Sequence, residues 1–222
     1  MTLQETLATL ESLGTAQNRK VYTRHGAGEI LFGVSFANLG ALKRKIKVNH
    51  PLAQELWATG NFDARVLATM IADPAQASAA ELDSWVGIIE GYALADAVSR
   101  FAAATPLAHK RMEQWMKSKK EYVAQTGWQV FAHLARQDGA LTDEYALERL
   151  AHIESHIHTA KNRERHAMNS AVIAIGVRGP ALQKLALAAA ARIGKVTVDH
   201  GQTGCETPDA AAYIRKAAAR AK

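Results

Sequence analysis

Residues 33–72 are GVSFANLGALKRKIKVNHPLAQELWATGNFDARVLATMIA, and this stretch decides the fold because it joins three short amphipathic helical patterns with almost no loop between them. Helices joined that tightly must stack on their neighbours, as in an α-solenoid, whose successive helices line one concave face. The basic residues of the stretch are Lys43, Arg44, Lys45 and Lys47. We therefore expect a basic concave face and a large anionic ligand.

Helical signals continue on both sides of this stretch. Capping residues, prolines and glycines predict helices over about 2–14, 15–25, 35–47, 51–60, 61–72, 78–104 with a break near Gly91, from Pro106, from Ser118, over 142–156, 161–177, 180–193, and from 207 onward. Only residues 195–198 resemble a strand, and they are too isolated to form a sheet. The class is all-α. Helix pairs that recur roughly every 30 to 45 residues fit HEAT-like units, although a simple helical bundle has similar element lengths.

Composition predicts one domain over residues 1–222. A chain of 222 residues with 48% hydrophobic content buries a large core without disulfides or metals, and its single cysteine fits a reducing compartment. The first residues lack the basic start of a signal peptide, and the sequence has no run of 18 apolar residues. We expect a cytoplasmic monomer that has no cofactor and no membrane partner.

The net charge of +6 is unevenly distributed along the chain. Residues 1–105 contain 9 Lys and Arg against 10 Asp and Glu, whereas residues 106–222 contain 18 against 11. Such a basic half favours a polyanionic partner. A solvated basic surface accounts for the same charge equally well.

Several short motifs, each weakly specific by itself, occur in a characteristic order. They are the segments 32–74, 82–96 (LDSWVGIIEGYALAD), 124–135 (AQTGWQVFAHLA), 167–176 (AMNSAVIAIG) and 207–214 (TPDAAAYI). In order and spacing, over about residues 22–214, the chain resembles the DNA alkylation repair family of HEAT-like repeat DNA glycosylases. The resemblance is strongest between Gly33 and Pro74.

The resemblance implies that the protein binds duplex DNA and excises purines that alkylation at N3 or N7 has made cationic. A cationic base leaves readily, so the enzyme chiefly stabilises the positive charge that develops on the sugar. The family's aromatic residue and catalytic aspartate, four positions apart on one helix, fall on Tyr92 and Asp96. Tyrosine stands where the family usually has tryptophan. Without the resemblance, Asp96 would be taken for a solvent-facing helix residue.

Two further family positions differ in this chain. Gln125 occupies the place of an arginine three residues before Trp128, and Ser170 falls at or near a second cleft tryptophan. Trp128 remains the tryptophan expected to reach the cleft, whereas Trp57, Trp85 and Trp115 are expected in the core. A non-catalytic, DNA-structure-binding member of the family therefore stays open as an alternative, as does a protein-binding helical array.

Expected phosphate contacts come from basic residues at helix starts, where backbone N–H groups also favour an anion. Besides Gln125 and Trp128, the expected DNA-binding residues are Lys117, Lys119, Lys120, Lys161, Arg163, Arg165, Lys43 and Lys47. A charge run of this kind is more often simply a solvated face.

Other motifs point to weaker alternatives. His152 and His156 have the i, i+4 spacing of zinc ligands, and His158 is close, but the glutamate of an HExxH motif is missing. We therefore expect no metal site. Cys205 with His200 is more typical of a structural loop than of a thiol nucleophile, and residues 26–33 do not match a nucleotide-binding loop.

Overall fold

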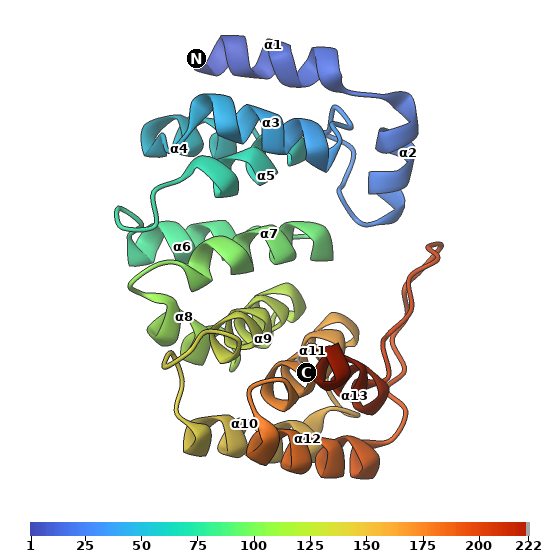
Figure 1. The fold of residues 1–222 in the computed structure, drawn as a ribbon. Helices are drawn as coiled ribbons and strands as arrows, with labels where there is room; N and C mark the ends of the chain where they lie inside the picture. Colours follow the sequence, from blue (N-terminus) through green and yellow to red (C-terminus); the bar gives the residue numbers. More distant parts are fainter. Residues whose placement is uncertain (221–222) are drawn as a thin grey trace. The chain divides into compact units, whose positions relative to one another are not determined.

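The computed structural model describes residues 1–220 and is all-α, which confirms the predicted fold class. Thirteen helices form in the described residues: α1 Leu3–Leu13, α2 Ala16–Arg24, α3 Phe36–Ile46, α4 His50–Ala58, α5 Phe62–Ile71, α6 Ala79–Gly87, α7 Tyr92–Ala103, α8 Ala108–Trp115, α9 Glu121–Ala135, α10 Asp143–His156, α11 Asn162–Gly176, α12 Pro180–Ile193 and α13 Ala210–Arg220 (Figure 1).

The chain divides into two compact units. The first unit comprises Met1–Ala108 with Gly201–Thr203, and the second comprises His109–His200 with the chain from Gly204 onward. The expectation of one domain over residues 1–222 therefore stays a prediction.

In the first unit, α5 is the central helix. It packs against α3, α4 and α7, while α1 covers α4 and α5 (Figure 1). A row of aromatic rings supports this packing: Trp57 stacks on Trp85 with centroids 4.2 Å apart, and Trp85 meets Phe101 at 5.3 Å. These tryptophans are 5% and 3% exposed. They are core residues, as the sequence predicted.

A buried carboxylate fixes the connection that enters α3. Asp63, in the first turn of α5, is fully buried and accepts backbone N–H bonds from Phe32 at 2.6 Å, Gly33 at 2.9 Å and Val34 at 2.9 Å. Three converging donors compensate the desolvation of one carboxylate. Gly33 has φ of +81°, a left-handed conformation that favours glycine. The connection at 32–34 is therefore held in one geometry.

The predicted break near Gly91 is a complete interruption between α6 and α7. A Cβ atom on Gly91 would lie 1.8 Å from the carbonyl oxygen of Gly26. Only glycine permits this close approach. It brings the connector after α2 against the start of α7.

The second unit is built around α9 and α11. These two helices pack extensively on each other, and α11 also contacts α10, α12 and α13. A Cβ atom on Gly127 would lie 2.5 Å from the backbone nitrogen of Met116, so α9 also lies tightly against the end of α8. Helix α9, which carries Trp128, is therefore covered by α11 and by the end of α8.

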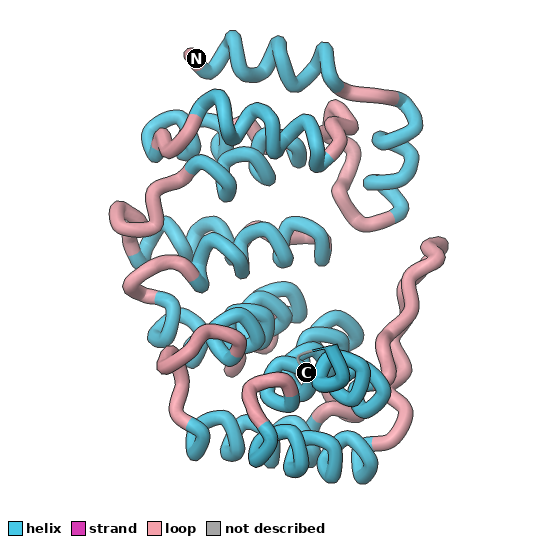
Figure 2. Tube along the Cα trace, in the orientation of Figure 1, coloured by secondary structure: helices cyan, strands magenta, loops and turns pink. Residues whose placement is uncertain are grey.

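One local prediction needs correction. The helix predicted from Ser118 begins at Glu121 with Lys120 as N-cap, because Ser118 Oγ accepts a bond from the Lys120 N–H two residues on. Residues 195–198 form no sheet, as the sequence predicted, and belong to a long loop between α12 and α13 (Figure 2). Within residues 1–220, the only β-type pairing is an isolated bridge between Gly14 and Val34.

We expect Asp63→Asn to lower the free energy of unfolding by about 2–3 kcal/mol. The amide removes the charge and turns an NH2 group toward backbone donors. Urea unfolding followed by circular dichroism measures the change. Asp138→Asn, the same change at an exposed site, is the control and should leave stability nearly unaltered. Equal stability of the two variants would contradict the role of Asp63.

Candidate functional site

Asp96 lines an open pocket within the first unit. The pocket has a volume of about 660 Å³ and is formed by α3, α5 and α7, with Phe36, Met70 and Phe101 among its apolar lining residues. Asp96 is half-buried on α7. The carboxylate therefore lies in a partly desolvated environment, where its electrostatic effect on a ligand is stronger than in bulk water.

Two cations line the same pocket. Lys43 belongs to the last turn of α3, and Arg100 follows Asp96 by one turn of α7. Both side chains are exposed. Of the two α3 lysines expected to contact DNA, Lys43 lines the Asp96 pocket, whereas Lys47 is exposed at the C-cap of α3 and is not among the lining residues. Their contact with DNA stays a prediction. The pocket thus combines one carboxylate with two cationic side chains.

Tyr92 lies one turn before Asp96, at the start of α7. It is half-buried, and its hydroxyl hydrogen-bonds with Nδ1 of His25, which follows α2. The two rings have centroids 5.9 Å apart. The hydroxyl that distinguishes tyrosine from tryptophan therefore has a hydrogen-bond partner. This hydrogen bond connects the end of α2 to α7, the helix that carries Asp96.

A smaller aromatic pocket adjoins the Asp96 pocket. Its volume is about 240 Å³, and its lining residues are Val21, Tyr22, His25, Phe36, Phe62 and Ala93. Phe36 and Ala93 line both pockets. Sequence reasoning missed the aromatic pocket because its rings come from α2, α3 and α5, and no spacing along the chain relates them.

Gln125 and Trp128 do not lie at a DNA-accessible surface, which corrects the expectation that they contact DNA. They are 2% and 1% exposed. Trp128 stacks on His152 with centroids 5.7 Å apart and meets Phe131 edge-on. The physical reason is that α9 packs extensively on α11 and is buried along most of its length.

The predicted basic residues of the second unit fall into two groups. Lys117, Lys119 and Lys120 are exposed before α9, and Lys117 pairs with Glu113 at 3.4 Å. By contrast, Lys161 donates to the Lys119 carbonyl oxygen at 2.7 Å. The start of α11 is thereby tied to the chain that precedes α9.

Arg163 and Arg165 are half-buried on α11. The Arg163 N–H donates to the Glu121 carboxylate at 2.6 Å, and Arg165 donates to the carbonyl oxygens of Thr197 and Ala160 at 2.9 Å each. Arg165 therefore has an internal structural role. Its use as a phosphate contact would require these bonds to break.

One polar face of α11 holds the loop between α12 and α13. Asn162 makes two bonds with the backbone of Asp199, at 2.8 and 2.7 Å, and Asn169 donates to Pro208 at 2.9 Å. On the same face, His166 meets the ring of His200 at 5.6 Å. Ser170 is also on α11, where its hydroxyl donates to the His166 carbonyl oxygen.

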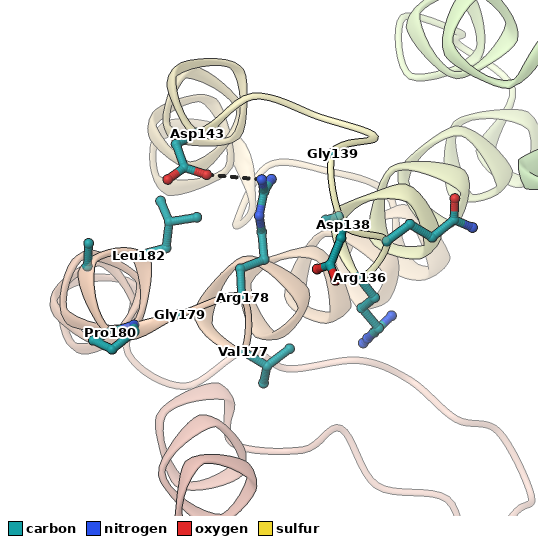
Figure 3. A pocket seen from close by; sticks show the side chains of 12 residues that line it. Arg136, Asp138, Gly139, Asp143, Val177, Arg178, Gly179, Pro180 and Leu182 are labelled. Atoms are coloured by element: carbon teal, nitrogen blue, oxygen red, sulfur yellow. Dashed lines mark ion pairs between the residues drawn. The ribbon is translucent and has the colours of Figure 1, made fainter. Parts of the chain in front are cut away.

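A third pocket, of about 560 Å³, lies at the turns that follow α9 and α11 (Figure 3). Its Arg178 points toward Asp143, with which it pairs at 3.0 Å, and also donates to the Leu141 carbonyl oxygen. Because this guanidinium is already neutralised, the pocket offers a ligand little net charge.

The histidine motif forms a ring stack instead of a metal centre. His152 and His156 stack with centroids 4.2 Å apart, and His152 continues onto Trp128. The described residues contain no group of three or more His, Cys, Asp or Glu side chains arranged to hold a metal ion. Cys205 is exposed. In residues 1–220, no helix has the length and apolar character needed to span a membrane.

Comparison with known proteins identifies relatives over nearly the whole chain. A family model described as DNA alkylation repair enzyme matches residues 6–214. Two uncharacterised proteins, from Listeria innocua and Listeria monocytogenes, are each 29% identical to this chain. The first alignment covers 94% of this chain and 93% of the relative, and the second covers 96% of both.

A solved structure is also similar. It is described as a new family of proteins related to the HEAT-like repeat DNA glycosylases with affinity for branched DNA structures. The TM-score is 0.92 at 29% identity, over 100% of this chain and 95% of that chain. The match supports the HEAT-like repeat assignment made from the sequence.

The contact of α11 with its loop predicts a pH-dependent stability. Burial, His200 and Arg163 together lower the pKa of His166 to about 4. As the pH falls from about 6.5 toward 4, the unfolded chain binds a proton that the folded chain excludes, so the free energy of unfolding decreases. At about pH 5 this loss amounts to about 2 kcal/mol.

Urea unfolding of the wild type and of His166→Gln at about pH 7 and about pH 5 isolates this contribution. The decrease between the two pH values should be smaller in the variant. His109→Gln, at an exposed histidine, should behave like the wild type. An equal decrease in all three proteins would show that His166 does not take part.

Proposed function

This chain belongs to the DNA alkylation repair enzyme family, and from this membership and the site geometry we propose that it binds DNA and excises cationic N3- or N7-alkylated purines. The half-buried Asp96 carboxylate, in an open pocket with Lys43 and Arg100, is the observation that supports this function. It is the feature in the described chain that best matches the charges of a reacting nucleotide.

The proposed chemistry needs one well-placed negative charge. Loss of an already cationic base leaves positive charge on the deoxyribose, and a fixed carboxylate beside the sugar stabilises the transition state more than the ground state. The same carboxylate orients a water molecule for attack at the anomeric carbon. Tyr92, one turn before Asp96, packs against the sugar and backbone in this proposal.

The cations of the pocket have a complementary role. Lys43 and Arg100 bind the phosphates on either side of the reacting sugar. In the second unit, the exposed Lys117, Lys119 and Lys120 also bind DNA phosphates in this proposal. Binding that neutralises several phosphates weakens steeply with salt. The basic face expected from the sequence remains part of this proposal.

A second candidate function is binding of branched DNA without excision. The similar solved structure is described as having affinity for branched DNA. In addition, Gln125 and Trp128 are buried, and Ser170 leaves the family's second cleft ring absent. The site thus has fewer aromatic and cationic side chains than the family pattern. This difference favours a protein that recognises the shape of DNA without excising a base.

We expect the wild type to release free base from a duplex that contains N7-methylguanine, and Asp96→Asn to release it at least about 10²-fold more slowly. Chromatography of the released base measures the rate. Asp138→Asn, the same change at an exposed site of the second unit, should keep the wild-type rate. Absence of release by folded wild-type protein that binds the duplex would contradict excision.

The second candidate predicts tighter binding to a three-way or four-way junction than to a linear duplex of the same length. Fluorescence anisotropy at two salt concentrations gives both affinities, and each should weaken with salt. A preference for the junction without base release would favour the second candidate. Absence of binding to either DNA at low salt would exclude both functions.

A further inference from the structure

His25 lies where the end of α2 meets the start of α7. A hydrogen bond joins its Nδ1 atom to the Tyr92 hydroxyl, and the two rings have centroids 5.9 Å apart with planes inclined by 59°. The two residues are 67 positions apart in the chain. Packing between elements, and not local sequence, therefore brings them together, and sequence reasoning assigned no role to His25.

The backbone on both sides of this hydrogen bond is in close contact. Gly26 directly follows His25, and Gly91 directly precedes Tyr92. A Cβ atom on Gly91 would lie 1.8 Å from the Gly26 carbonyl oxygen, so the two chain segments approach as closely as glycine allows. The backbone thus holds the two side chains at the separation that their hydrogen bond requires.

Open volume lies beside the pair. Tyr92 is half-buried, and His25 forms part of the wall of the aromatic pocket of about 240 Å³. Ala93, which follows Tyr92, lines the same pocket. A tyrosine ring at such a half-open position has more than one staggered rotamer available. A directional hydrogen bond at the tip of the ring favours one of them.

The orientation of the Tyr92 ring matters because of its place on α7. Tyr92 and Asp96 are one helical turn apart, so their side chains lie on the same side of the helix. In the proposed function, the ring packs against the sugar whose developing charge Asp96 stabilises. Catalysis is sensitive to displacements of about 1 Å in such contacts. A residue that fixes the ring therefore affects the reaction through Tyr92.

We propose that His25 is a positioning residue for excision: its hydrogen bond with the Tyr92 hydroxyl holds the Tyr92 ring against the deoxyribose of the alkylated nucleotide. This inference rests on the proposed function, since it requires the sugar to lie at Asp96. The tyrosine that replaces the family's tryptophan has a smaller ring, and its hydroxyl gives that ring a second point of attachment.

The experiment measures single-turnover release of N7-methylguanine from a duplex. Tyr92→Phe keeps the ring and removes only the hydroxyl. We expect it to release the base about tenfold more slowly, a factor that corresponds to the loss of one hydrogen bond. His25→Leu should show the same decrease. Fluorescence anisotropy should give both variants the wild-type affinity for an undamaged duplex, because the lost interaction contributes at the transition state.

Three further variants separate positioning from a general structural effect. The double variant His25→Leu/Tyr92→Phe should be no slower than either single variant, because both changes remove the same hydrogen bond. His25→Asn should recover most of the wild-type rate, since an amide both donates and accepts and so replaces the imidazole in either tautomer. His109→Leu is the matched control. This exposed histidine of the second unit has its ring 5.4 Å from that of Tyr145, and its loss should leave the rate unchanged.

The outcomes distinguish this inference from the proposed function. Absence of base release by folded wild type would overturn both. Wild-type rates in His25→Leu and Tyr92→Phe would overturn the positioning role alone and leave excision intact. A double variant slower than either single variant would show that His25 acts by another route, which would also overturn it. A rate for His25→Asn as low as that of His25→Leu would do the same.

Discussion

The first unit depends on the burial of one carboxylate. Asp63 would be costly to desolvate alone, and it is tolerated because the N–H groups of Phe32, Gly33 and Val34 all converge on it. This constraint fixes the connector that leads into α3 and, through the Val34 carbonyl oxygen, the position of Tyr22. The walls of both candidate pockets are therefore set by an interaction that lies outside them.

The second unit uses polar groups in a comparable way. Lys161 and Arg165, which the sequence suggests as phosphate ligands, instead bond to carbonyl oxygens of their own unit. Asn162 and Asn169 extend this polar face and hold a long loop that has few apolar residues of its own. Internal hydrogen bonds to charged side chains are strong in such settings. Basic charge in a sequence therefore serves structure as well as ligand binding.

The candidate site differs from the family pattern in a physically consistent way. A tryptophan offers a large ring with a single donor, whereas Tyr92 needs a partner for its hydroxyl and has one in His25. That contact depends on the close approach of Gly26 and Gly91, which brings the α2 connector to α7. The aromatic surface near Asp96 is then supplied by rings of other helices. Family membership fixes the scaffold, while these local contacts shape the candidate site.

The sequence by itself determined the all-α class, because capping and periodicity are local properties. Its resemblance to a known family, and not periodicity, indicated the HEAT-like scaffold and drew attention to Tyr92 and Asp96, which lie four positions apart on one helix. It placed Gln125 and Trp128 at a DNA surface, since their spacing does not reveal that α9 is covered on several sides. Only the tertiary structure decided that Lys43 and Asp96 line one pocket, and that Tyr22, Phe36 and Phe62 surround another. Such proximities arise from packing between helices far apart in the chain, which leaves no periodic signal in the sequence.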